Sequence, residues 1–161
     1  MTTSFCTVAE ADIYFNDRLF SDAWFSSISA DKQKALNMAT RKINNVPFVG
    51  VKEDTLQENA FPRCYRYSAF LNQYEATFNG LNWYCDITVP QAIKDACCEE
   101  ALALIETGTS ERGKLQRDGV QSFSVGGLSE TYKKGANKER LKSLEAMQML
   151  QPWLVFGTSY K

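Results

Sequence analysis

Few residues of this chain have the types and spacing that catalysis requires. The sequence contains no histidine, the commonest general base, metal ligand and activator of serine or cysteine nucleophiles. Its five cysteines include no CxxC pair and no zinc-ligand spacing, and they are Cys6, Cys64, Cys85, Cys97 and Cys98. We therefore expect no catalytic centre, no metal site and no cofactor. We interpret all five cysteines as free thiols in a reducing compartment, with Cys97 and Cys98 buried as small hydrophobic residues.

Carboxylates and glycines give two weaker indications of chemistry. Glu99-Glu100 and the Glu10/Asp12 pair lie in predicted helices, where neighbouring positions point in different directions. A solvated helix face is therefore favoured over an acid–base pair, and an enzyme that uses carboxylates is the weakest alternative. The cluster Val125-Gly126-Gly127-Leu128 lacks the lysine and the strand–helix context of a phosphate-binding loop.

Basic residues gather in two clusters, although the net charge of the whole chain is only −1. Any contact with nucleic acid would need such local patches. The first cluster is Arg112, Lys114 and Arg117, and the second is Lys133, Lys134, Lys138, Arg140 and Lys142. The second cluster, close to Phe123 and Tyr132, could contact phosphates and bases. The alternative, a solvated surface offset by nearby glutamates, is favoured.

The elements that would position these residues are mainly helical. Apolar residues at helical spacing predict a four-helix bundle-like domain, with helices over residues 8–19, 30–44, 90–106 and 138–150. The predicted N-caps are Thr7, Ser29 and Asn137, and residues 88–91 fit a capping box. The buried stripe of the first helix is expected to be Val8, Ala11, Phe15 and Leu19. The third helix is apolar over so much of its circumference that we expect it either at the centre of the bundle or at a subunit contact.

Three segments interrupt or follow the helices. Residues 53–88 form an aromatic-rich insertion, in which we expect one short helix near residues 67–74. Residues 119–132 predict a β-hairpin that turns at Gly126-Gly127. The tail over residues 151–161 is too apolar to lie free in solvent, so it is expected to cover either this core or a partner. A two-stranded hairpin alone is marginally stable, so it needs a neighbour. The residues that we predict to bind a partner are Phe123, Val125, Gly126, Gly127, Leu128, Trp153, Leu154, Val155 and Phe156.

Length and hydropathy fit one domain spanning residues 1–161, with its helical core over about residues 8–150. No apolar run approaches the roughly 20 residues that span a bilayer. The first residues lack the basic start and apolar run of a signal peptide. We therefore expect no membrane partner and synthesis in a cytoplasm.

Short motifs follow one another in an order that resembles a family of small proteins of tailed bacteriophages. They are AEADIYF followed by Trp24, the pattern AL…AT…I…F.G.K within residues 34–52, Leu56, Phe61-Pro62-Arg63, Val89-Pro90-Gln91-Ala92-Ile93 before an alanine-rich helix, Gly127-Leu128-Ser129-Glu130-Thr131-Tyr132, and Leu150-Gln151-Pro152. The order is similar to that of head–tail connector (adaptor, or head completion) proteins. Some relatives carry the label "putative DnaT-like single-stranded-DNA-binding protein".

The resemblance implies a structural role in the virion, at the interface of head and tail. It implies a homo-oligomeric ring, commonly a dodecamer, that docks beneath the portal protein. The ring would surround the DNA channel and offer a platform to a tail-side stopper or tail completion protein. The alternative is an accessory protein of replication that binds single-stranded DNA, with Lys133, Lys134, Lys138 and Arg140 as candidate DNA or partner contacts.

Overall fold

A computed structural model describes residues 4–66, 83–109, 122–125, 128–131 and 141–155. As predicted, this part of the chain is mainly helical and carries a small antiparallel hairpin. The helices are α1 (Val8–Asn16), α2 (Asp22–Phe25), α3 (Ser29–Asn44), α4 (Gln91–Thr109) and α6 (Leu144–Leu150), followed by the 3-10 helix η2 (Gln151–Trp153).

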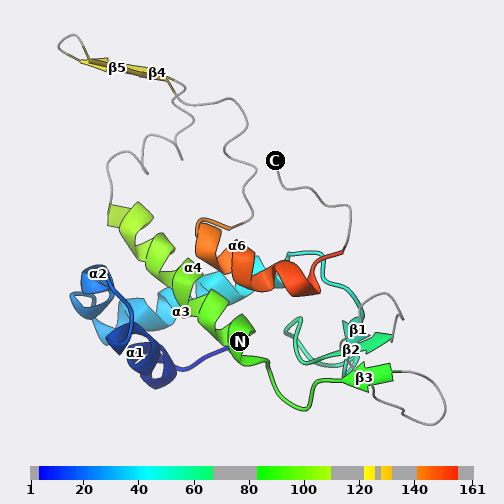
Figure 1. Ribbon diagram of the computed structural model, residues 1–161. Helices are drawn as coiled ribbons and strands as arrows, with labels where there is room; N and C mark the ends of the chain where they lie inside the picture. Colours follow the sequence, from blue (N-terminus) through cyan, green and yellow to red (C-terminus); the bar gives the residue numbers. More distant parts are fainter. Residues whose placement is uncertain (1–3, 67–82, 110–121, 126–127, 132–140, 156–161) are drawn as a thin grey trace.

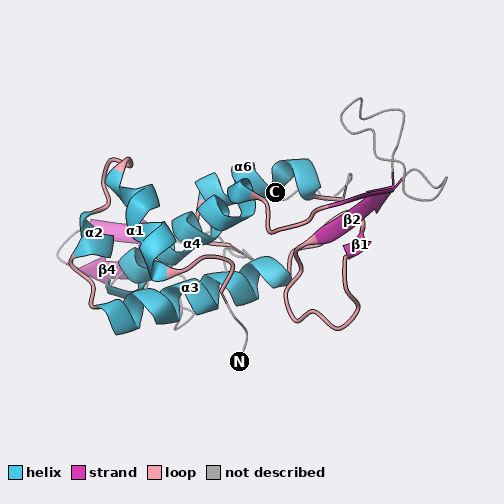
Figure 2. Cartoon of the chain, turned by 90° about the horizontal axis from the view of Figure 1, so that it is seen from below, coloured by secondary structure: helices cyan, strands magenta, loops and turns pink. Residues whose placement is uncertain are grey.

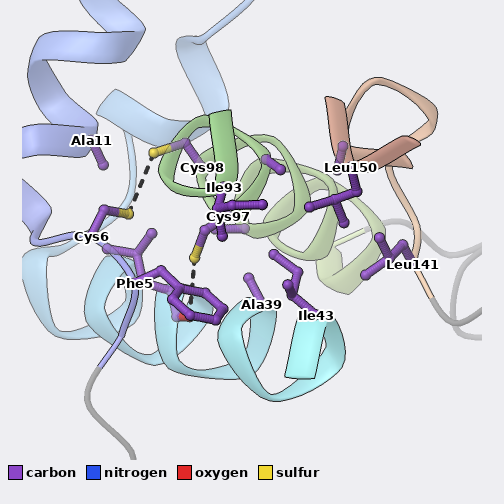
Figure 3. Packing of buried hydrophobic residues seen from close by; sticks show 14 of the residues in the cluster. Phe5, Cys6, Ala11, Ala39, Ile43, Ile93, Cys97, Cys98, Leu141 and Leu150 are labelled. Atoms are coloured by element: carbon purple, nitrogen blue, oxygen red, sulfur yellow. Dashed lines mark hydrogen bonds between the residues drawn. The ribbon is translucent and has the colours of Figure 1, made fainter. Parts of the chain in front are cut away.

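Helix α4 is the central element, which is one of the two positions that its sequence indicated. It packs against α3 and α6 and also contacts α1 and α2, and Figure 2 shows it between α3 and α6. The largest fully buried apolar side chains come from several of these elements, and they are Phe15, Trp24, Leu36, Ile43, Phe61, Ile93 and Leu150. Figure 3 shows part of this core around the α3–α4 contact. No helix within the described ranges is both long enough and apolar enough to cross a membrane.

The start of α1 confirms the predicted N-cap, whereas its end corrects the prediction. Thr7 forms a capping box with Glu10: its hydroxyl accepts from the Glu10 amide at 3.2 Å, and its amide donates to the Glu10 carboxylate at 2.7 Å. The helix ends at Asn16, and Leu19 is 78% exposed instead of buried. The Ser21 hydroxyl donates to the carbonyl of Phe15, and Phe20 has a left-handed φ of 59°, so the chain reverses before Leu19 can reach the core.

Two other predicted caps differ from the structure. Ile28 occupies the N-cap position of α3, and Ser29 is its first helical residue. Asn137 lies outside the described residues, and α6 begins at Leu144, later than the predicted start at residue 138. Ser143 is its cap, because its hydroxyl accepts from the Ala146 amide at 3.1 Å.

The region predicted as an insertion contributes strands that the sequence did not predict. Strands β1 (Val51–Lys52), β2 (Arg63–Arg66) and β3 (Trp83–Cys85) form an antiparallel sheet in that order. The register of β2 and β3 places Cys64 opposite Cys85, and the two form a disulfide. The expectation that all five cysteines are free was therefore wrong. The helix predicted near residues 67–74 lies outside the described residues.

The motif F.G.K has a structural explanation in the loop before this sheet. Phe48 is buried in the core, and the Lys52 ammonium donates to the carbonyls of Gln57 and Glu58. Gly50 has a φ of +77°, and a Cβ atom there would lie 2.2 Å from the Cys64 carbonyl oxygen. Only glycine therefore fits this position without strain.

The motif Phe61-Pro62-Arg63 holds the same loop from the other side. Arg63 is buried, and its guanidinium donates to the backbone carbonyls of Phe48, Val49, Gly50 and Ala60 at 2.7–3.3 Å. It also lies over the rings of Phe48 and Phe61. These contacts make the motif part of the scaffold.

Candidate interaction surfaces

The β-hairpin formed by β4 (Ser122–Val125) and β5 (Leu128–Thr131) is the first candidate surface, and its presence confirms the prediction. Figure 1 shows it beyond the end of α4, apart from the helices. Phe123 lies opposite Glu130, and Val125 lies opposite Leu128. Because opposed residues share a face and the faces alternate along each strand, this register places the three apolar residues on one face. Gly126 and Gly127 lie outside the described residues.

The chain returns from the hairpin to the helical body at Lys142 and Ser143, and Glu100 of α4 holds this point. One oxygen of the Glu100 carboxylate accepts from the Lys142 and Ser143 amides at 2.6 and 2.9 Å. The other accepts from the Lys42 ammonium of α3 at 2.6 Å. Glu100 is fully buried, so its ion pair with Lys42 and its two amide donors replace the lost water.

Glu99, the neighbouring carboxylate, holds the turn that follows α1. It accepts from the Tyr14 hydroxyl at 2.8 Å and pairs with the Arg18 guanidinium. Burial, together with Glu99, raises the pKa of Tyr14 above its usual value, so the phenol stays a donor. Glu99 and Glu100 are both buried, and the predicted solvated face for this pair was wrong. Glu10 and Asp12 are partly exposed and form ion pairs with Lys94 and Lys32.

The second candidate surface, the tail, packs on this chain's own core as far as Val155. The Val49 amide donates to the Trp153 carbonyl at 2.8 Å, and Leu154 forms a β-bridge with Phe48. The Trp153 ring meets the Phe61 ring edge-on at 6.3 Å. Trp153 and Leu154 are partly buried by these contacts, whereas Val155 is 43% exposed. Phe156 lies outside the described residues.

The cysteines that remain free lie in the core and are unsuited to nucleophilic chemistry. The sulfurs of Cys6 and Cys98 are 3.5 Å apart, and the Cys97 sulfur lies 3.4 Å from the Thr40 hydroxyl. Figure 3 shows the three cysteines among the buried apolar side chains. The neighbouring Cys6 thiol, together with burial, raises the pKa of Cys97 well above its usual value. Within the described ranges, no cluster of His, Cys, Asp and Glu could hold a metal ion. The absence of a catalytic centre stays a prediction.

The basic clusters stand out against the rest of the chain by their charge. Residues 110–142, which we call the hairpin segment, contain eight Lys and Arg and four Asp and Glu, a net charge of +4. The remaining residues contain ten basic and fifteen acidic residues, a net charge of −5. Lys133, Lys134, Lys138 and Arg140 lie outside the described residues, as do Arg112, Lys114 and Arg117.

Most basic side chains of the helical body already have partners. Ion pairs at 2.9 Å or less join Arg18, Lys32, Lys34, Lys42 and Lys94 to carboxylates. Arg63 is buried among carbonyl groups. The described helices therefore show no concentration of unpaired positive charge, whereas the sequence of the hairpin segment has a net excess of four positive charges.

Sequence reasoning missed one exposed feature. Five large apolar residues near the N-terminus are exposed, and they are Ile13, Leu19, Phe20, Phe25 and Ile28. The exposure of Phe25 next to buried Trp24 was not apparent from the sequence. The signal available was Ser21, a small hydroxyl residue directly after Leu19-Phe20, which ends the helical pattern and turns the chain.

Comparison with known proteins identifies a family but no individual relative. No curated protein and no solved structure matches the chain significantly. One family model matches residues 2–161, almost the entire chain. The chain therefore belongs to the family described as "Putative DnaT-like ssDNA binding protein".

Proposed function

We propose that this protein binds single-stranded DNA through the hairpin segment, residues 110–142. The observation that carries the proposal is the uneven charge, +4 in this segment against −5 in the rest of the chain. The family description supports the same ligand. Of the two functions derived from the sequence, DNA binding is therefore favoured over the head–tail adaptor.

The chemistry of the segment suits a flexible polyanion. Lysine and arginine side chains neutralise phosphates and release condensed counterions, which makes binding independent of base sequence and sensitive to salt. Phe123 and Tyr132 add aromatic rings on which bases can stack. The helices hold the C-terminal end of the segment in place, because Glu100 of α4 accepts from the Lys142 and Ser143 amides and from the Lys42 ammonium of α3.

A titration with a fluorescently labelled single-stranded oligonucleotide tests this function. We expect the wild type to bind at low salt. The double variant Lys133→Gln/Lys134→Gln should bind up to about tenfold more weakly. The matched control is Lys34→Gln/Lys52→Gln, which removes the same charge from exposed positions of the body and should bind like the wild type. No measurable binding at low salt, or an equal loss in both variants, would refute the proposal.

The head–tail adaptor is a second candidate, favoured by a specific observation. The hairpin stands apart from the helices, and exposed apolar residues occur at the turn after α1, so the chain presents two features that suit packing against neighbours. In this role, the chain would form a ring between the portal and tail-side proteins of a virion. Mass spectrometry of purified particles of the encoding phage tests it: the adaptor must be present in every intact particle, and its absence excludes the role.

A further inference from the structure

The exposed apolar residues near the N-terminus are an unusual feature for a chain of this size. Leu19 and Phe20 are 78% and 85% exposed, and Ile13, Phe25 and Ile28 are 47–69% exposed. We call these five residues the α1–α2 corner. Figure 1 shows α1 and α2 at the end of the body opposite the β1–β3 sheet. Large exposed apolar residues this close together in the sequence are candidates for a protein contact.

Hydrogen bonds between Arg18 and a buried carboxylate hold the corner in place. The Arg18 guanidinium donates to the carbonyls of Leu19 and Phe20 at 2.8 and 3.2 Å, and its other nitrogens bond to buried Glu99. Phe20 adopts a φ of 59°, which a non-glycine residue keeps only when its surroundings impose it. The two apolar side chains are therefore presented on a turn fixed from inside the body, as a preorganised contact surface would require.

The charges around the corner indicate what would cover it. Asp17, Asp22 and Asp31 are exposed in this part of the chain, but Asp31 pairs with exposed Lys34 and Arg18 is engaged by Glu99, so the acidic excess comes from Asp17 and Asp22. A partner with apolar residues between basic ones would therefore complement this surface. The hairpin segment has this composition: Phe123, Val125 and Leu128 share one face of the hairpin, and the segment carries a net charge of +4.

We propose that the hairpin of one copy of this chain docks on the α1–α2 corner of a second copy. The hairpin of the same copy does not cover the corner, since Leu19 and Phe20 are exposed with the hairpin in place. The contact gives the two-stranded hairpin the neighbour that its stability requires. Each copy has one hairpin and one corner, so the contact is heterologous and joins copies head to tail, into a closed ring or an open filament.

Sedimentation of the purified full-length chain without DNA tests the contact, using one variant on each side. The corner variant is Leu19→Ser/Phe20→Asn, in which asparagine tolerates the left-handed φ. The hairpin variant is Phe123→Ser/Val125→Ser. We expect the wild type to associate with increasing concentration, and each variant to lose at least about tenfold in association constant. The control Leu56→Ser/Ile87→Ser, at positions 88% and 95% exposed, should associate like the wild type.

Mixing the two variants distinguishes this contact from other arrangements. The corner variant keeps an intact hairpin and the hairpin variant an intact corner, so an equimolar mixture should form a heterodimer that neither variant forms alone. Circular dichroism of each variant checks that the helices remain folded, because the corner residues are exposed. A monomeric wild type, a mixture that stays monomeric, or a hairpin variant that associates normally would overturn the proposal. DNA binding by the corner variant should be retained, so the two proposals can fail separately.

Discussion

Single carboxylates organise this molecule at the residue scale. Glu99 and Glu100 are consecutive, yet Glu99 fixes the turn after α1 through Arg18, and Glu100 fixes the start of α6 and the end of the hairpin segment. Each carboxylate joins elements that are far apart in the sequence. The α1–α2 corner and the point where the hairpin segment returns to the helices therefore both depend on α4 for their position.

Replacing Glu100 should destabilise the fold. In Glu100→Ala, the Lys142 and Ser143 amides lose their acceptor and Lys42 loses its buried partner. We expect a loss of about 3 kcal/mol in the free energy of unfolding, measured by urea denaturation. The control Glu53→Ala, at an exposed position, should change it by less than about 0.5 kcal/mol. Equal effects of both substitutions would show that the Glu100 contacts do not stabilise the fold.

Gly50 and Gly108 form a matched pair for a second test. In Gly50→Ala, the new methyl group meets the Cys64 carbonyl at a left-handed φ, so we expect a loss of about 2 kcal/mol or more. In Gly108→Ala, the methyl group lies in a helix with no atom within 4 Å, and stability should be unchanged or slightly raised. Thermal unfolding of both variants measures the contrast, and a Gly50→Ala variant as stable as the wild type would contradict the loop geometry.

At the scale of elements, the capping box of α1 should make stability depend on pH. The hydrogen bond from Lys94, with those from Thr7, lowers the pKa of Glu10 from 4.5 to about 2. Because the folded pKa is the lower one, the stabilisation is complete above pH 4.5 and is lost as the pH falls towards 2. Glu10→Gln should therefore cost about 1 kcal/mol at neutral pH, with the difference vanishing near pH 2. A difference that persists at the acidic end would rule out this cause.

The disulfide between β2 and β3 also belongs to this scale. It joins cysteines 21 positions apart, and closing a loop of that length stabilises a fold by about 3 kcal/mol. Thiol titration of protein purified without reductant and then unfolded should find three thiols, and five after reduction. Finding five thiols before reduction would contradict the disulfide and support the free cysteines that the sequence led us to expect.

Local patterns predicted the elements that local chemistry determines. The Thr7–Glu10 capping box, central α4 and the hairpin could all be derived from neighbouring residues. Contacts between distant residues could not, because the partners of Glu99 and Glu100 lie 81 and 58 positions away. The same reason hid the Cys64–Cys85 pair, which depends on the register of two short strands. For the proposed surfaces, the hairpin was predicted, whereas the corner was missed because Leu19 continues the helical spacing of α1.

The sequence also could not decide whether the C-terminal tail packs on this chain or on a partner. Its apolar residues were predicted to cover either this core or a partner, and the structure places Trp153 and Leu154 on this core. These two residues therefore serve the scaffold, so their removal should affect folding before it affects any partner.

At the scale of the whole molecule, charge divides the chain in two. Outside the hairpin segment, acidic residues are in excess, and five of the ten cations form ion pairs among the described residues, whereas the hairpin segment has a net charge of +4. That positive charge can bind phosphates. In the absence of DNA, it can also bind the acidic residues near the α1–α2 corner of another copy. DNA and a second copy would then compete for one segment, so added oligonucleotide should weaken self-association.

The salt dependence of DNA binding tests the central claim most directly. The logarithm of the association constant for a single-stranded oligonucleotide should fall linearly with the logarithm of salt concentration, by about 0.7 for each phosphate contacted. We predict that Lys133→Gln/Lys134→Gln flattens this slope by about 1.4 and that Lys34→Gln/Lys52→Gln leaves it unchanged. A wild-type slope near zero, or the same slope in all three proteins, would contradict the account.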